Sequence, residues 1–320
     1  MKTKNTLMTA AAMLASIGLY AAQMYIPTVE IGDAYNDADT RSYAEGGTPG
    51  AGKVDYVYNI GTTGVTAAQY ATFLNAVATD KGAASHILNL YSASMNTSSY
   101  GCGITRVDNG DSYSYTVTAG KENMPVNFIT VYDAMRFCNW LTTSDTEIGV
   151  YMLNNTATGL ALITRNEEAW LAGGVAIASL DEWYKAAFYQ GDGTYSTFAN
   201  GQDSITNAEA NFYGSGFDNL SSVFTFQDVN TNHYGVLDMN GNVYEWTDSV
   251  TGSYVYLRGG YFNVDAEWLA ASVADYVTPS AQYGIVGFRV SSLQPIPEPS
   301  TYAAIFGALA LTVAIYRRRK

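Results

Sequence analysis

The sequence predicts a mixed fold of helices and short strands in which an unusually large share of the chain is irregular. Three observations support this prediction. Three segments repeat apolar residues at helical spacing, and short alternating runs are typical of strands. The connections at 80–120, 142–165 and 190–232 are long and rich in Gly, Asn, Ser, Thr and Tyr. The 320 residues, 48% of them apolar, can build one large domain or two small ones.

The first 22 residues are typical of a secretory signal peptide. Lys2 and Lys4 precede an apolar run over residues 7–20, and small residues follow at Ala21 and Ala22. A charged start, an apolar centre and a small-residue cleavage site are the three parts of such a signal. The alternative is an N-terminal membrane helix, which the shortness of the apolar run disfavours. We therefore expect export, with cleavage near Ala22.

Local signals predict the elements that follow. Residues 23–53 have little periodicity and predict an extended lead-in with at most one edge strand. Alternation over 54–58 and 113–117 predicts strands. Three helices are predicted by a residue that can cap the first turn and by an apolar stripe behind it. These caps and stripes are Thr66 with Tyr70, Phe73, Leu74 and Val77; Thr130 with Ala134, Phe137, Cys138 and Leu141; and Ser179 with Leu180, Trp183, Tyr184 and Ala187.

Charge and cysteine content exclude several classes of function. Six of the 16 basic residues lie at the two ends, which leaves ten against 29 acidic residues, a balance of about −19 for the body. Such a surface repels nucleic acid and anionic lipid and suits divalent cations. Cys102 and Cys138 are too few for a disulfide scaffold or a cysteine metal cluster. They could pair in an oxidising compartment, but Cys138 is predicted to be a core residue of a helix.

Five short segments occur in a fixed order within residues 54–291. They are 65–75; 125–127 with 132–134 and 138–141; 181–187; 235–246; and 257–260 with 287–290. Together they resemble the sulfatase-modifying-factor family, the family of the formylglycine-generating enzyme. The resemblance implies a single compact α+β domain over 54–291, related to the C-type-lectin fold, in which ions hold much irregular backbone.

The segment from Asp238 to Trp246 predicts a calcium site. Asp238 and Glu245 are hard oxygen ligands on either side of Gly241, a residue that can turn backbone carbonyls inward. The family resemblance implies that Asp238, Gly241, Val243 and Glu245 hold a structural Ca²⁺. A second and fainter family site implies a ligand at Asn211. The alternative is an ordinary Asn-Gly turn with a solvated glutamate.

The family resemblance also allows a test for catalysis. The formylglycine-generating oxidase binds copper(I) through two cysteines shortly after its Arg-Gly-Gly segment, because soft thiolates suit that metal. Those positions hold Val264 and Leu269 here, and no cysteine follows Cys138. An iron-dependent branch uses three histidines, whereas this chain has only His86 and His233, which we expect at the surface or packed.

We therefore predict no catalytic residue and a binding role. The 26 tyrosines suit either ligand recognition or loop packing. The candidates for a binding rim, which would contact an extracellular polysaccharide or a surface protein, are Trp246, Tyr261, Phe262 and Trp268. Arg258 and Arg289 are expected to be structural ion-pair partners. The alternative function is an oxidoreductase-type enzyme of this family with an unknown substrate and a different metal.

The segment 292–320 resembles a sorting signal. Pro297, Glu298 and Pro299 precede an uncharged run over 300–316, and a basic cluster over 317–320 follows. This arrangement resembles the PEP-CTERM signal of Gram-negative bacteria that produce exopolysaccharide. It implies recognition by an exosortase, transient contact with the inner membrane and delivery to the cell surface or matrix. The prolines keep the motif extended, as a cleaving enzyme requires.

Overall fold

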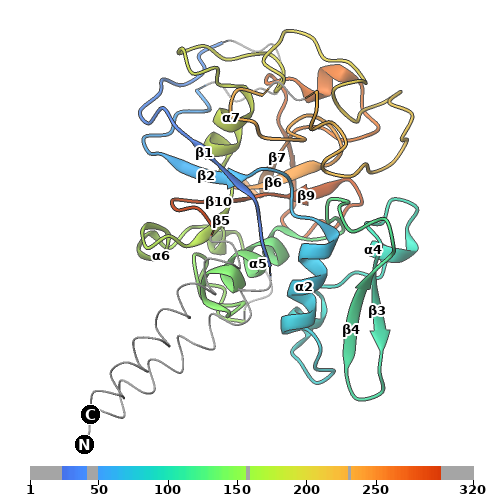
Figure 1. Cartoon of the computed structure of the whole chain (residues 1–320). Helices are drawn as coiled ribbons and strands as arrows, with labels where there is room; N and C mark the ends of the chain where they lie inside the picture. The colour runs from blue at the N-terminus through green and yellow to red at the C-terminus, as the bar shows by residue number, and fades with distance from the viewer. Residues whose placement is uncertain (1–23, 42–49, 156–158, 230–231, 297–320) are drawn as a thin grey trace, which may run out of the picture. The chain divides into compact units, whose positions relative to one another are not determined.

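A computed structural model describes residues 24–41, 50–155, 159–229 and 232–296 (Figure 1). The chain divides into two units, and one of them, Pro27–Pro295, holds nearly all of these residues. The predicted signal peptide and the sorting motif with its apolar run lie outside the described residues. Among the described residues, no helix is both long and apolar enough to span a bilayer.

The described strands form two four-stranded sheets and one hairpin. The first sheet is antiparallel, in the order β1-β2-β10-β5, and the second, in the order β8-β7-β6-β9, has one parallel pair, β6 with β9. The first sheet consists of β1 (Thr28–Ile31), β2 (Tyr58–Gly61), β10 (Val290–Ser292) and β5 (Val175–Ile177). The second consists of β8 (Asp275–Val277), β7 (Tyr254–Arg258), β6 (Tyr244–Thr251) and β9 (Val286–Phe288). The hairpin joins β3 (Ile104–Asp108) to β4 (Tyr113–Val117).

The three predicted helices are confirmed together with their caps. In each, the capping hydroxyl accepts from the third backbone N–H, and the side chain at that third position bonds back to the backbone of the cap. They are α2 (Ala67–Val77, capped by Thr66), α5 (Val131–Thr143, capped by Thr130) and α7 (Leu180–Phe188, capped by Ser179). Short helical turns are α3 (Ser85–Leu88), α4 (Ser94–Thr97), α6 (Glu167–Leu171), η1 (Leu160–Leu162) and η2 (Ala266–Leu269).

The lead-in takes part in the fold. β1 pairs along its whole length with β2, from Thr28 opposite Gly61 to Ile31 opposite Tyr58, and so forms one edge of the first sheet. The strand predicted to start at Val54 begins only at Tyr58, because the Val54 N–H donates to the Asn36 side chain at 3.2 Å instead of joining a ladder. The structured unit therefore includes most of the segment expected to be an extended lead-in.

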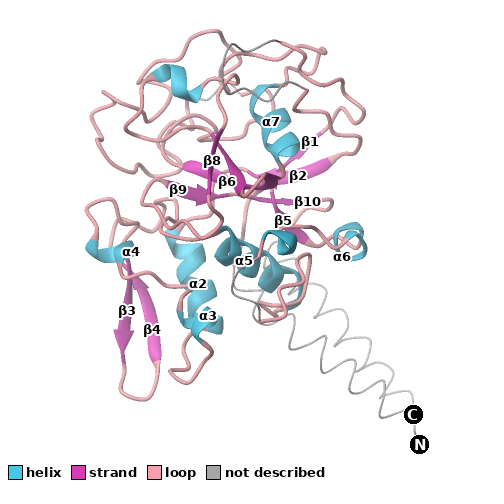
Figure 2. Cartoon of the chain, turned by 180° about the vertical axis from the view of Figure 1, so that it is seen from behind, coloured by secondary structure: helices cyan, strands magenta, loops and turns pink. Residues whose placement is uncertain are grey.

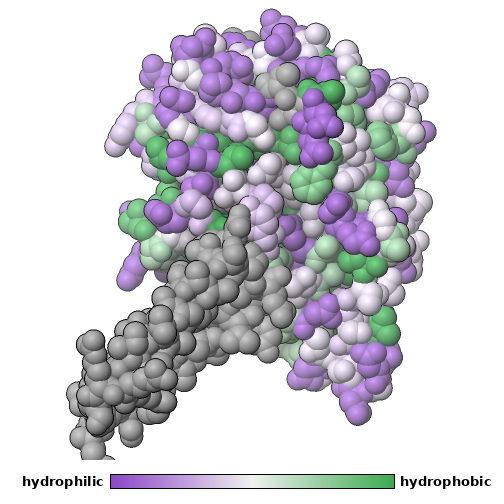
Figure 3. All heavy atoms as spheres, in the orientation of Figure 1, coloured by the Kyte–Doolittle hydropathy of each residue, from purple (hydrophilic) through white to green (hydrophobic). Residues whose placement is uncertain are grey.

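Aromatic side chains join helices and sheets. Phe137 of α5 packs edge-on against Phe73 of α2 and against Phe288 of β9, with ring centroids 5.4 Å and 5.3 Å apart. Cys138, also on α5, is buried, and it is free, as is buried Cys102, so these thiols do not pair in the structure. The irregular connections lie mostly around the second sheet and α7 (Figure 2), and polar and apolar side chains are interspersed on the visible face (Figure 3).

Candidate functional site

Glu245 and Arg289 form a buried ion pair at the centre of the predicted calcium segment. Arg289 Nε and Nη2 donate to Glu245 Oε2 and Oε1 at 2.5 Å and 2.6 Å, and Trp183 Nε1 donates to Oε2 at 2.7 Å. Neither charged side chain is more than 2% exposed. Both carboxylate oxygens of Glu245 are thus engaged by donors, and the prediction of a structural ion pair at Arg289 is confirmed.

Asp238 is the member of the predicted calcium set that remains open to a cation. Its backbone is left-handed, with a φ of 54°, and its Oδ2 is buried without a hydrogen-bond partner. Burial raises the pKa of the Asp238 carboxyl to about 8, against the lowering effect of Arg289. An orphaned buried oxygen fits a cation, since a positive charge would compensate the lost hydration of the carboxylate.

The rest of the predicted set is only partly brought together. Asn211 forms a parallel bridge with Gly241, which has a φ of 79° and no room for a Cβ against the Asn211 carbonyl. Val243, two residues after Gly241, is buried. Glu245 forms an ion pair with Arg289. Within the residues that the structure describes, no group of three His, Cys, Asp or Glu is placed to hold a metal. Two of the four predicted ligands, Gly241 and Val243, would bind through backbone carbonyls, so the four-ligand calcium site stays a prediction, with Glu245 shared with Arg289.

A cavity of about 20 Å³ lies beside Asp238, large enough for one water or ion. Its polar walls include Asn200, Glu209 and Asn240. Asn240 already accepts from the Ala199 N–H and donates to the Leu269 carbonyl, both at 2.7 Å. The carboxylates of this lining are Glu209 and Asp238, and Asp238 is the one with a buried oxygen that has no hydrogen-bond partner.

The positions that carry the cysteine pair in the family's oxidase are occupied by hydrocarbon. Leu269, at the end of η2, is 1% exposed and packs against Gly260. The Val264 carbonyl accepts from the Tyr213 N–H at 3.0 Å. Burial raises the pKa of both thiols, Cys102 and Cys138, which keeps them in their unreactive neutral form.

The binding rim predicted from sequence needs correction. Trp246 is fully buried and donates from Nε1 to the Ile129 carbonyl at 3.2 Å, and Phe262 is only 2% exposed. Neither side chain can contact a ligand at the surface in this structure. Tyr261 is half-buried, while Trp268 is 47% exposed. Two of the four aromatic residues predicted for a binding rim are core residues, because indole and phenyl rings pack in protein cores as readily as they line binding sites.

The two histidines lie where the sequence predicted. His233 is exposed and packs edge-on against Tyr234, with ring centroids 4.7 Å apart. His86 is largely packed, and its Nε2 lies 3.5 Å from Glu147 Oε1. Arg258 also has a structural role, but the contacts seen for it are hydrogen bonds that it donates to the carbonyls of Ala271 and Val273, whereas the sequence predicted an ion pair.

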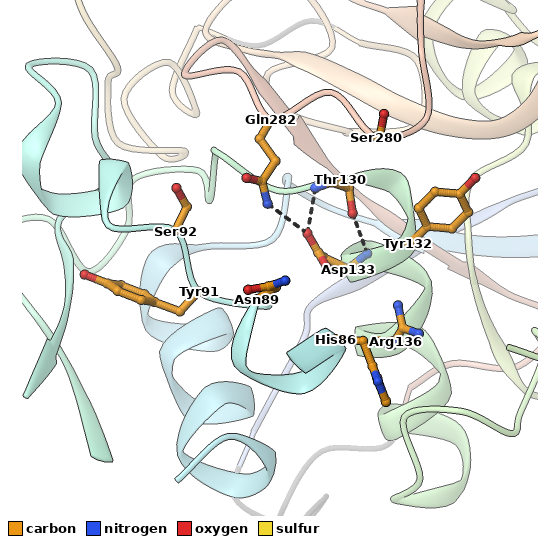
Figure 4. A pocket seen from close by; sticks show the side chains of 10 residues that line it. All are labelled: His86, Asn89, Tyr91, Ser92, Thr130, Tyr132, Asp133, Arg136, Ser280 and Gln282. Carbon is orange, nitrogen blue, oxygen red and sulfur yellow. Dashed lines mark hydrogen bonds between the residues drawn. The ribbon is translucent and has the colours of Figure 1, made fainter. Parts of the chain in front are cut away.

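Two features of the structure were not predicted from the sequence. One is a buried network in which Arg165 donates to Asp248 at 2.6 Å and to Glu182 at 2.7 Å. The other is an open polar pocket of about 420 Å³ (Figure 4). Its lining residues come from three distant segments, so no local motif could reveal it. They are His86, Asn89, Tyr91 and Ser92; Thr130, Tyr132, Asp133 and Arg136; and Ser280 and Gln282.

The fold agrees with comparisons to known proteins. Residues 27–292 match the model of the sulfatase-modifying factor enzyme 1-like domain, and the chain therefore belongs to that family. The family resemblance and the single α+β domain predicted from sequence are confirmed. Among the curated proteins compared, none matches the chain.

Solved structures show the same fold. Variable protein 1 of Treponema denticola has a TM-score of 0.54 at 16% identity, covering 83% of this chain and 95% of its own. CarF has a TM-score of 0.54 at 23% identity, covering 84% of this chain and 99% of its own. PvdO from Pseudomonas aeruginosa has a TM-score of 0.48 at 17% identity, covering 85% of this chain and 93% of its own. At these identities the first two likenesses establish the fold alone.

Proposed function

We propose that this chain is an exported, non-catalytic member of its family whose domain binds a glycan or a protein at the cell surface or in the extracellular matrix. The observation that carries the proposal is the hydrocarbon at Val264 and Leu269, where the oxidase requires two thiolates. Leu269 is packed against glycine backbone, and the chain's two thiols are buried with raised pKa values. Copper-dependent oxidation therefore has no ligands at this position.

Turnover of a substrate peptide tests the non-catalytic role. The purified protein would be incubated with copper, oxygen and a cysteine-containing sulfatase peptide, and conversion to formylglycine would be followed by mass spectrometry. We expect no conversion, with an active family member as the positive control. Formation of formylglycine would overturn the proposal. Stoichiometric iron or copper retained after incubation would instead favour the alternative, an oxidoreductase with another metal.

Export and sorting form the second part of the proposal. The charged start and apolar run at residues 1–22, and the Pro297-Glu298-Pro299 motif before a basic end, support it. An exosortase-type enzyme is the partner that this motif suits. Replacing Glu298 by Ala should leave the protein in the inner-membrane fraction, whereas the wild-type chain should reach the surface or the medium. An unchanged distribution between fractions would contradict the sorting role.

A further inference from the structure

The floor of the pocket of about 420 Å³ holds one acidic and one basic side chain. Asp133 accepts from the Thr130 N–H at 2.8 Å, and Arg136 donates to both oxygens of Glu147 at 2.7 Å and 3.1 Å. Asp133 and Arg136 are only 5% and 1% exposed. An anionic ligand would therefore meet a cation that is already paired with Glu147.

The mouth of the pocket carries neutral polar groups. In the described part of the chain, the side chains of Asn89, Ser92 and Ser280 have no hydrogen-bond partner. The Gln282 side chain donates one hydrogen bond, to Asp133 at 3.5 Å. Figure 4 shows Gln282 reaching toward Thr130 and Asp133 from the loop that precedes β9. Amides and hydroxyls both donate and accept, which is the chemistry that sugar hydroxyls require.

Tyr91 belongs to the lining, but its ring packs against the neighbouring hairpin. The ring contacts the Tyr115 ring, with centroids 5.5 Å apart, and the Arg106 guanidinium lies over it at 5.0 Å. Figure 4 shows this ring directed away from the other labelled side chains. The groups that the pocket offers a ligand are therefore the neutral amides and hydroxyls.

A second pocket adjoins the first at His86. Its volume is about 410 Å³, and its walls include Asp145, Asn154 and Asn155. Each pocket is within the range of roughly 300–1,000 Å³ that small ligands occupy. Two polar pockets that share one wall residue suit a linear chain better than a single small molecule. The acidic residues of the second pocket, and the negative balance of the whole body, disfavour an anionic chain.

We propose that these adjoining pockets bind a stretch of a neutral glycan chain, with Asn89 and Gln282 bonding sugar hydroxyls. This inference rests on the proposed function and gives it a site and a ligand class. An apolar ligand is disfavoured because most of the lining is polar, and an anion because the one buried cation, Arg136, is already paired with Glu147.

An oligosaccharide array tests the ligand class and a pair of matched variants tests the site. The purified full chain would be applied to neutral and uronate-containing oligosaccharides of increasing length, and affinities for the best binder would be measured by calorimetry. We expect neutral chains to bind, and longer ones to bind more tightly than monosaccharides. The double variant Asn89→Ala/Gln282→Ala should lose at least tenfold in affinity. The control, Asn96→Ala/Gln227→Ala, removes the same groups from exposed positions outside both pockets and should bind as the wild type does.

A blocking variant guards against misfolding as an explanation. Ser280 is exposed at the mouth, so Ser280→Trp should abolish binding while its melting temperature stays unchanged. Glycan binding that survives both the double and the blocking variants would overturn the site but leave the proposed function standing. A preference for uronate chains, or no binding to any oligosaccharide, would overturn the inference. The formylglycine assay judges the non-catalytic role separately.

Discussion

Arg289 is fully buried, yet each of its three nitrogens has a partner. Nε and Nη2 of Arg289 donate to Glu245. Nη1 donates to the Gly61 carbonyl and Nη2 also to the Leu237 carbonyl, both at 3.0 Å. A single side chain thus joins β2, β6 and the loop before β6 to β9–β10. Such a pair costs much to desolvate, but removing one partner costs more because the other charge is left buried alone.

Removing the carboxylate should therefore be severely destabilising. We expect Glu245→Ala to lower the free energy of unfolding by about 3–5 kcal/mol. Urea denaturation would measure the loss, with Glu267→Ala, an exposed carboxylate, as the control that changes little. The loss should be equally large in chelator, since Arg289 causes it. A loss that vanishes in chelator would show instead that Glu245 acts through a bound cation.

At Asp238, in contrast to Glu245, we expect an effect that depends on calcium. Its Oδ2 has no partner in the protein, so a cation that binds there should stabilise the fold. At a free Ca²⁺ concentration 100 times the Kd, the gain would be about 2.7 kcal/mol, or some 2–4 °C in melting temperature for each kcal/mol. Asp238→Asn should abolish this gain. If wild type and variant melt alike with and without calcium, the calcium site predicted from the sequence is wrong.

At the scale of elements, the sequence predicted what is local and missed what is not. α2, α5 and α7 were predictable because the cap and the apolar stripe of each lie within a dozen or so residues of one another. The polar pocket could not be predicted because its mouth residue Gln282 and its floor residue Asp133 are distant in sequence and meet only after folding. Arg289 could be assigned a structural role from its motif, but its partner Glu245 could not be told from a calcium ligand without the geometry.

The caps can be tested one by one. In α2, Thr66 Oγ1 accepts from the Gln69 N–H at 3.3 Å, and Gln69 bonds back to the Thr66 N–H at 2.9 Å. Thr66→Ala should cost about 1 kcal/mol of unfolding free energy. Thr72→Ala in the same helix is the matched control, because its hydroxyl bonds only to the Ala68 carbonyl and alanine favours a helix. Equal effects of both substitutions would refute the capping contribution.

Lys185 of α7 predicts a rise in stability with pH. Its Nζ is tied to the Gly32 and Asp33 carbonyls, and burial lowers the pKa of Lys185 to about 8. Between that value and the ordinary 10.5, the unfolded chain binds the proton and the folded chain does not. The contribution of Lys185 to the free energy of unfolding should therefore increase by about 1–2 kcal/mol from pH 8 to 9.5. The raised pKa values of the buried thiols Cys102 and Cys138 act in the opposite direction over this range, so the Lys185 contribution is read from a comparison with a variant.

The variant Lys185→Met provides the comparison for this pH dependence. It lacks the titrating amine, so this part of the slope should be missing in urea titrations at the two pH values. The window stops at pH 9.5 because tyrosines of the unfolded chain begin to ionise near their ordinary pKa of 10.0. Identical slopes in wild type and variant would contradict the lowered pKa of Lys185.

At the scale of the whole molecule, the matched family domain coincides with one of the two units of the chain. Pro27–Pro295 forms its own unit, and the family model covers 27–292. We expect a chain limited to residues 24–296 to melt at the same temperature as the full chain and to remain monodisperse in gel filtration. A melting temperature lower by more than a few degrees would show that the ends support the fold.

The placement of β10 has a consequence for the timing of folding. This strand is among the last residues of the domain to be synthesised, yet it lies between β2 and β5, so without it the first sheet falls into two parts. Folding can therefore reach completion only after residue 292 has emerged, when nearly the entire domain has left the ribosome or crossed a membrane. We therefore expect a chain that is cut short before β10 to lack the complete first sheet and to be more open to proteases.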